Sequence, residues 1–201
     1  VLGLSRVGST LLDMILGTQS PYIGVGELYE VFRPEWAHYK RGLVCSCGMK
    51  SDRCPFWREL CAELTRFPSS SPQKKYAFAI NHFRNVFGED AIMVDSSKLL
   101  EALKAILVEH TTNVKVIHLV RDVRPWTISR LDERSRNSRH FRKEGYYIKN
   151  LIYRYGWKVE VIWPLLVLLT RFASYYFWLW HLQNLTVERY LESNNIDYRR
   201  V

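Results

Sequence analysis

The sequence has few cysteines and no cluster of basic residues at either end, and each absence excludes a class of protein. Only four of the 201 residues are cysteines, too few for a disulfide scaffold in a chain of this length. Lys and Arg outnumber Asp and Glu by 29 to 20, so the formal net charge is +9 and we expect an anionic partner. The basic residues are spread along the chain and no nucleic-acid motif is present, so we expect no nucleic-acid partner.

Long apolar runs are also scarce. Val161–Leu169 is very apolar and aromatics return at Tyr175–Trp180, but Arg171 and His181 interrupt the run of about 20 apolar residues that a span needs. We expect the apolar segment 157–184 to form a buried or interface helix pair, with a membrane-surface helix over 161–180 or a true span as alternatives. The chain opens inside an apolar strand and stops within another expected strand, which indicates a fragment truncated at both ends, mainly after Val201.

Short apolar runs alternate with helical patterns and predict an α/β fold. The expected strands are 1–4, 91–94, 114–120 and 196–201. Helical spacing follows the first strand, with Gly17 as the C-cap, and recurs over 99–107, while Pro125 is suited to open a further helix. The pattern predicts a single domain, 1–201, with a central parallel sheet covered on both faces, whose ligands bind at the carboxyl ends of the strands. Segments 67–75 and 134–145 are expected to be loops.

A candidate phosphate loop follows the first expected strand. Gly3-Leu4-Ser5-Arg6-Val7-Gly8-Ser9-Thr10 fits the skeleton G-x-x-x-x-G-x-[ST], but Ser9 stands where the lysine belongs. Glycines let the backbone N–H groups converge and the next helix adds its positive end, which together favour an anion site. Arg6 then supplies the cation as a planar fork. The alternative is a plain strand–helix turn with a surface arginine.

A second candidate anion site lies at the end of the third expected strand. Arg121 ends that strand and Ser129 follows eight residues later, about one turn into the helix if Pro125 opens it. The two side chains could close on one phosphate from two sides. The alternative is that Arg121 pairs with Asp122 and that Ser129 is only a helix surface residue. Two separate anion sites indicate a nucleoside with phosphates at two positions.

Together these motifs resemble the family of sulfotransferases that use 3′-phosphoadenosine 5′-phosphosulfate (PAPS), in its prokaryotic and protein-tyrosine branches. The family's 5′-phosphosulfate loop is matched by Arg6-Val7-Gly8-Ser9-Thr10 and its 3′-phosphate motif by Arg121 and Ser129. The resemblance implies a P-loop, three-layer α/β/α fold and PAPS as the donor, with no metal. It assigns donor binding to Ser5, Arg6, Val7, Gly8, Ser9, Thr10, Arg121 and Ser129.

The resemblance also implies catalytic roles for three residues. Gly26-Glu27, with Glu27 twenty-one residues after Arg6, is similar to the Gly-Glu pair whose glutamate is the general base. Lys98 resembles the residue that neutralises the leaving oxygen, while Arg6 holds the sulfuryl oxygens. The alternatives are a surface carboxylate at Glu27 and a solvated lysine at Lys98, with Asp95-Ser96-Ser97 capping the helix that follows.

The segment 40–75 holds all four cysteines: Cys45, Cys47, Cys54 and Cys61. Their spacing is C-x-C followed by a lone cysteine, not paired C-x-x-C units, so structural zinc is not expected. A similar segment occurs in some sulfotransferases of the prokaryotic type, and we interpret it as an acceptor-side insert in which reduced thiols are favoured over a disulfide. The basic stretch with Arg134, Arg136, Arg139, Arg142 and Lys143 is expected either to grip an anionic acceptor or to be a solvated face.

The sequence therefore predicts a sulfotransferase that transfers a sulfuryl group from PAPS to an acceptor hydroxyl. A protein tyrosine, a glycan, a lipid and a small phenol all remain open as acceptors. The alternatives are a non-catalytic module that binds phosphoadenosine or polyanions and, less favoured because the loop lysine is absent, a P-loop kinase. A cytoplasmic location is favoured, with membrane association and the Golgi lumen left open.

Overall fold

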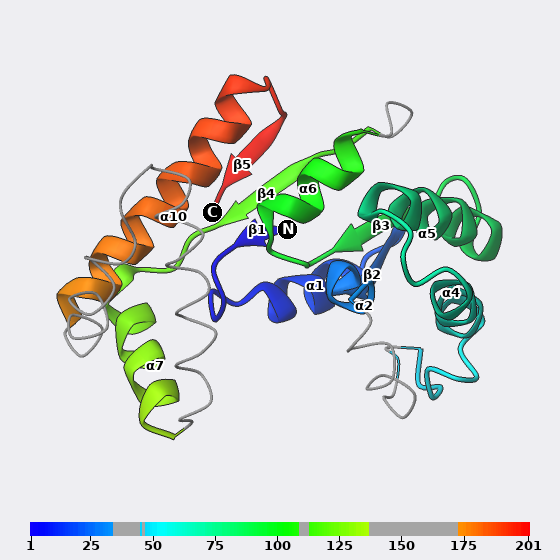
Figure 1. The fold of residues 1–201 in the computed structure, drawn as a ribbon, viewed down its shortest axis with the longest axis horizontal. Coiled ribbons are helices and arrows are strands. Elements are labelled where there is room, and N and C mark those ends of the chain that lie inside the picture. The colour runs from blue at the N-terminus through cyan, green and yellow to red at the C-terminus, as the bar shows by residue number, and fades with distance from the viewer. Residues whose placement is uncertain (34–44, 46, 109–112, 137–172) are drawn as a thin grey trace. The chain divides into compact units, whose positions relative to one another are not determined.

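The computed structural model of the chain describes residues 1–33, 45, 47–108, 113–136 and 173–201 (Figure 1). Within these ranges the chain forms seven helices and five short strands, so the protein is of the mixed α/β class. The chain divides into two compact units. The first comprises Val1–Leu119 and Tyr190–Val201, and the second comprises Val120–Arg189.

All five strands belong to the first unit and pair in parallel. β1 (Leu2–Gly3), β4 (Val116–Leu119) and β5 (Tyr198–Arg200) form one sheet with β4 in the middle, in which Leu2 lies opposite His118. β2 (Tyr22–Gly26) and β3 (Ile92–Asp95) form a second, two-stranded sheet.

The backbone of Lys98 joins the two sheets. Its N–H donates to the Val1 carbonyl at 3.1 Å, and its carbonyl accepts from the Gly3 N–H at 3.3 Å. The continuation of β3 therefore runs beside β1, as a parallel bridge between Leu2 and Lys98 also shows. The strands follow one another in the order β2-β3-β1-β4-β5, so the carboxyl ends of β2, β3 and β1 are neighbours.

Five helices belong to the first unit: α1 (Ser9–Gly17), α2 (Leu28–Val31), α4 (Pro55–Arg66), α5 (Pro72–Phe87) and α6 (Leu100–Leu107). Local chemistry sets several of their ends. Pro55 and Pro72 occupy first-turn positions, where a missing N–H costs nothing. The Ser71 hydroxyl caps α5 by accepting from the Lys74 N–H at 3.4 Å. Gly88, with φ +93°, follows the last residue of α5.

The core of the first unit lies among β2, α2, α4, α5 and α6. Leu28, Leu60 and Tyr76 are completely buried there, and Phe32 packs edge-on against Tyr76 with ring centroids 4.7 Å apart. Burying a side chain of this size contributes about 1.5–3 kcal/mol. This core fixes α2, and with it the turn that carries Glu27.

Two glycines let α1 pack closely on β2. A Cβ atom on Gly24 would lie 2.8 Å from the Asp13 carboxylate, and one on Gly17 would lie 3.3 Å from the Gly24 nitrogen. Gly17 is the last helical residue and Thr18 is the C-cap, so the prediction of Gly17 as the cap is wrong. The glycine is needed for close approach, not for a left-handed turn.

In the second unit, α7 (Val123–Arg136) begins two residues before Pro125, the residue expected to open it. Asp122 explains the earlier start, because its carboxylate accepts from the Arg124 N–H at 2.8 Å and caps the helix. α10 (Ala173–Ser193) starts in this unit, and its Tyr176 packs edge-on against Trp126 with centroids 6.2 Å apart. No helix in the described ranges is both long and apolar enough to cross a membrane.

The sequence predictions of local structure are confirmed in part. Each of the four expected strands overlaps an observed strand, whereas β2 was not expected. The predicted loop at 67–75 is wrong over Pro72–Lys75, which begins α5, and Lys75 is buried with its ammonium bound to the carbonyls of Phe32 and Pro68 at 2.9 and 2.8 Å. The predicted loop at 134–145 is wrong over its first three residues, which end α7. Residues 137–145 and the apolar stretch 157–172 lie outside the described residues.

Candidate functional site

The loop between β1 and α1 leads into the N-terminus of α1. Gly8, the N-cap of α1, offers no side chain to the first turn, and that turn contains no acidic residue. Ser5, Arg6 and Thr10 are exposed, whereas Val7 and Ser9 are buried. The first-turn N–H groups of a helix have no partner within the helix, and together with the positive end of α1 they favour an anion, as the sequence motif predicts. That an anion binds here stays a prediction.

Gly3 is required where this loop leaves β1. A Cβ atom at this position would lie 2.5 Å from the Leu119 carbonyl oxygen of β4, closer than real contacts allow. Only glycine therefore permits β1 and β4 to pair at this register just before the loop.

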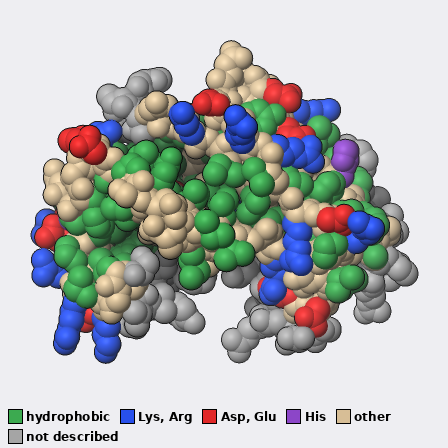
Figure 2. All heavy atoms as spheres, turned by 180° about the vertical axis from the view of Figure 1, so that it is seen from behind, with side chains coloured by type: hydrophobic (Ala, Val, Ile, Leu, Met, Phe, Trp, Pro, Cys, Tyr) green, Lys and Arg blue, Asp and Glu red, His purple; other side chains and the backbone are tan. Residues whose placement is uncertain are grey.

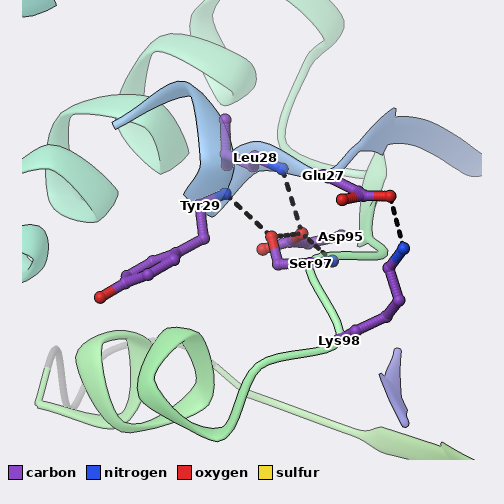
Figure 3. Close-up of polar contacts among 6 residues, drawn as sticks. All are labelled: Glu27, Leu28, Tyr29, Asp95, Ser97 and Lys98. Carbon is purple, nitrogen blue, oxygen red and sulfur yellow. Dashed lines mark hydrogen bonds and ion pairs between the residues drawn. The ribbon is translucent and has the colours of Figure 1, made fainter. Parts of the chain in front are cut away.

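Glu27 and Lys98 form an ion pair at the ends of β2 and β3 (Figure 3). The Lys98 Nζ atom lies 2.5 Å from Glu27 Oε1, and the Lys98 side chain is only 16% exposed, against 39% for Glu27. Lys98 is therefore not the solvated lysine that we considered as an alternative. Together with Arg6, these residues follow the three neighbouring strands β2, β3 and β1, so all three predicted catalytic residues come from one edge of the sheet.

Asp95 holds the turn that carries Glu27. Its Oδ1 atom accepts from the N–H groups of Leu28 and Ser97 at 3.4 and 2.8 Å, and also from the Ser97 hydroxyl. The Ser97 oxygen in turn accepts from the Tyr29 N–H at 2.8 Å (Figure 3). The first two N–H groups of α2 are thus bound by the last residue of β3 and by Ser97, two residues later, and Glu27, the N-cap of α2, is held beside Lys98.

This arrangement corrects one expectation. Asp95-Ser96-Ser97 was considered as the cap of the helix after Lys98, but α6 begins at Leu100 and no side chain caps it. Asp95 and Ser97 bind the N-terminus of α2 instead, because the parallel pairing of β2 with β3 brings the two strand ends together. The sequence carried only a local signal, so this long-range contact was missed.

Two candidate residues have a left-handed backbone. Arg6 has φ +67° and Lys98 has φ +66°, and among the described residues only Asn195 shares a positive φ without being glycine. A non-glycine residue in this region costs about 1–2 kcal/mol. Such strain persists where the surrounding structure enforces it, commonly at functional sites.

Two further ionisable groups lie close to the turn. The Tyr76 hydroxyl donates to Asp95 Oδ2 at 2.7 Å, and burial, followed by the charge of Asp95, holds the pKa of Tyr76 far above its usual range. Burial also raises the pKa of Asp13 on α1, opposed by a hydrogen bond from the Gly26 backbone and reinforced by the charge of Asp95. Tyr76 therefore remains a proton donor to Asp95 at any ordinary pH.

Arg121 and Ser129 both belong to the second unit. Arg121 is half-buried just before α7, and its carbonyl accepts from the Trp180 indole N–H of α10 at 2.9 Å. Ser129 is half-buried six residues after Val123, about 9 Å along the helix axis and not one turn in. Asp122 pairs with Arg124 at 2.8 Å, and the hydrogen bonds from the Arg124 side chain and N–H hold the pKa of Asp122 at about 2. That Arg121 and Ser129 bind one phosphate stays a prediction.

Basic side chains do not gather into one large patch on the face shown in Figure 2. Lys and Arg lie there singly or in small groups among apolar side chains. This agrees with the spread of the basic residues along the sequence. Of the expected basic loop, Arg134 and Arg136 lie in α7, and Arg139, Arg142 and Lys143 fall outside the described residues.

Searches for relatives returned no match: neither a protein-family model, nor a curated protein, nor a solved structure is significantly similar to this chain.

Proposed function

We propose that this protein transfers a sulfuryl group from PAPS to the hydroxyl of an acceptor. The observation that carries the proposal is the Glu27–Lys98 ion pair, 2.5 Å long, at the sheet edge from which the Arg6 loop also leaves. A carboxylate, an ammonium and a loop that leads into the N-terminus of a helix are the base, the leaving-group partner and the anion site that such a transfer needs.

The chemistry is an in-line displacement. The acceptor hydroxyl gives its proton to Glu27 as its oxygen bonds to sulfur. The bond between sulfur and the bridging oxygen breaks, and the electron pair passes to the 5′-phosphate of the departing 3′-phosphoadenosine 5′-phosphate. Lys98 donates to that bridging oxygen, while Arg6 and the loop N–H groups hold the sulfuryl oxygens. In the resting protein the two catalytic charges neutralise each other.

The proposal extends to the fold. A strand order of β2-β3-β1-β4-β5, with the glycine-containing loop between β1 and α1, supports a P-loop fold with helices on both faces of the sheet. In this proposal Ser5, Arg6, Val7, Gly8, Ser9 and Thr10 bind the 5′-phosphosulfate, and Arg121 with Ser129 bind the 3′-phosphate. The acceptor is a protein tyrosine, a glycan, a lipid or a small phenol.

Donor binding is the first test. Calorimetry on the whole protein without metal should show preference for 3′-phosphoadenosine 5′-phosphate over AMP. Arg121→Ala should weaken that binding by about 2–5 kcal/mol, well over tenfold. If the protein binds both nucleotides equally, the proposal fails. Mg²⁺-dependent binding of ATP would instead favour a kinase.

Transfer is the second test, with PAPS and a panel of phenols, sugars and tyrosine peptides. Glu27→Gln should lower the rate by about 10²–10⁴-fold and leave nucleotide affinity unchanged, because a general base acts only in the chemical step. Glu63→Gln is the matched control, since Glu63 pairs with Arg66 on the surface of α4 at 3.3 Å. If nucleotide binding is retained but no acceptor is sulfated, the binding-module alternative is favoured.

A further inference from the structure

Three of the four cysteines meet in space although the sequence separates them. The sulfur atoms of Cys45, Cys47 and Cys54 all lie within 4.8 Å of one another. Cys54 is buried, Cys45 is half-buried and Cys47 is exposed, so the group opens to solvent on one side. Cys61, the fourth cysteine, is not one of the group. None of the four cysteines forms a disulfide.

The sulfur spacing fits a tetrahedral metal site. Zinc binds thiolates at about 2.3 Å, so two sulfurs on one tetrahedral ion lie about 3.8 Å apart. The Cys45 and Cys54 sulfurs are 3.7 Å apart. Two packed thiols can also reach this distance, so the third sulfur is what distinguishes the group from ordinary packing.

The backbone around the group holds the sulfurs in place. A tight turn joins Cys45 to Gly48, whose N–H donates to the Cys45 carbonyl at 2.8 Å and whose φ of +83° favours glycine. The Cys45 N–H donates to the Met49 carbonyl at 2.7 Å. The turn therefore presents Cys45 and Cys47 to the same point.

Cys54 approaches from the start of a helix. It is the N-cap of α4 and, like Phe56 two residues later, belongs to the buried core of the first unit. Burial raises the pKa of the Cys54 thiol to about 11, so a metal ion has to displace its proton in order to bind.

We propose that Cys45, Cys47 and Cys54 bind one Zn²⁺ ion as thiolates, with water or one further donor in the fourth position. On binding, the three thiols release their protons to solvent, and no electron is transferred. The ion would tie the turn at Cys45–Gly48 to the first turn of α4, whose Phe56 and Leu60 are buried in the core. Zinc is not expected from the sequence alone, because C-x-C followed by a lone cysteine lacks paired spacing. The structure supplies the proximity that the spacing does not.

The metal itself is the probe. We expect the whole protein, purified with its thiols reduced, to bind one equivalent of Zn²⁺ and of Co²⁺, and the cobalt form to show thiolate charge-transfer absorption. Cys47→Ser carries the test, because its side chain is exposed and its loss leaves the core intact. Loss of a residue that only hydrogen-bonds to a metal ligand typically weakens metal binding by about 10–100-fold. Cys47→Ser removes a ligand itself, so it should weaken Zn²⁺ binding by more than that.

Cys61→Ser is the matched control, since it removes a thiol of the same segment that lies outside the group. It should keep the stoichiometry, the cobalt spectrum and the rise in melting temperature on adding Zn²⁺, all of which Cys47→Ser should lose. The proposal is overturned if the reduced protein binds no stoichiometric metal, or if Cys61→Ser loses as much affinity as Cys47→Ser. It is also overturned if the isolated protein carries a Cys45–Cys54 disulfide and binds metal no better after reduction.

Discussion

The left-handed backbone of Lys98 allows the effect of its side chain and the effect of its backbone strain on stability to be measured separately. Lys98→Ala and Lys98→Gly both remove the ion pair with Glu27, but only glycine adopts the φ of +66° without strain. We therefore expect Lys98→Gly to be the more stable of the two variants, although glycine normally destabilises a protein relative to alanine.

The size of the difference follows from two opposing terms. Relief of the left-handed strain contributes about 1–2 kcal/mol in favour of glycine. The greater freedom of glycine in the unfolded chain costs about 0.4–1 kcal/mol. The ion pair, worth about 1 kcal/mol or less at this exposure, is lost from both variants and cancels. Lys98→Gly should therefore exceed Lys98→Ala by about 1 kcal/mol, or about 2–4 °C in melting temperature for a domain of this size.

Thermal and urea unfolding of the two variants measure this difference. Lys104 in α6 is the matched control because its backbone is helical, so Lys104→Gly should be about 1 kcal/mol less stable than Lys104→Ala. Both Lys104 variants lose the same contact with the Tyr190 ring at 5.0 Å. If Lys98→Gly is also less stable than Lys98→Ala, Lys98 stores no backbone strain and the reasoning fails. Both Lys98 variants should lose sulfuryl transfer.

Three further predictions concern the packing around the site. Tyr76→Phe should lower the free energy of unfolding in urea by about 1.5–3 kcal/mol, because the buried hydroxyl donates to a charged acceptor, Asp95; an unchanged midpoint would refute this. The pKa of Asp13 is higher in the folded protein than in the unfolded chain. Between these two pKa values the folded protein therefore binds more protons, so its stability should fall as the pH rises through that window. Asp13→Asn should flatten that fall and be more stable at neutral pH, and a steeper pH profile for this variant would contradict the assignment. Gly3→Ala should lower the free energy of unfolding by about 1–3 kcal/mol or more, because the added Cβ atom would lie 2.5 Å from the Leu119 carbonyl oxygen. If calorimetry shows wild-type stability for this variant, β1 and β4 are not so closely paired.

Local sequence patterns were sufficient to place the loop at Arg6 and most of the elements around it. A short apolar run, a glycine-containing turn and a helical repeat are decided by residues close in the chain, and β1, the loop and α1 follow that order. β2 was missed because Gly24 and Gly26 interrupt its apolar residues and weaken the strand signal. The start of α5 was missed although Ser71-Pro72 is a sound capping pair, because the many Ser and Pro residues before it favoured a loop.

By itself the sequence determined the α/β class and, through a family resemblance, the choice of Arg6, Glu27 and Lys98. Only the tertiary structure decided that Lys98 forms an ion pair with Glu27, that Asp95 binds the N-terminus of α2, and that the sulfur atoms of three cysteines lie within 4.8 Å of one another. These contacts depend on which strands are neighbours and where the turns bring distant residues, and Glu27 and Lys98 are 71 residues apart. Local propensity carries no information about such pairs, because their free energy comes from charge, geometry and burial that exist only once the sheet has formed.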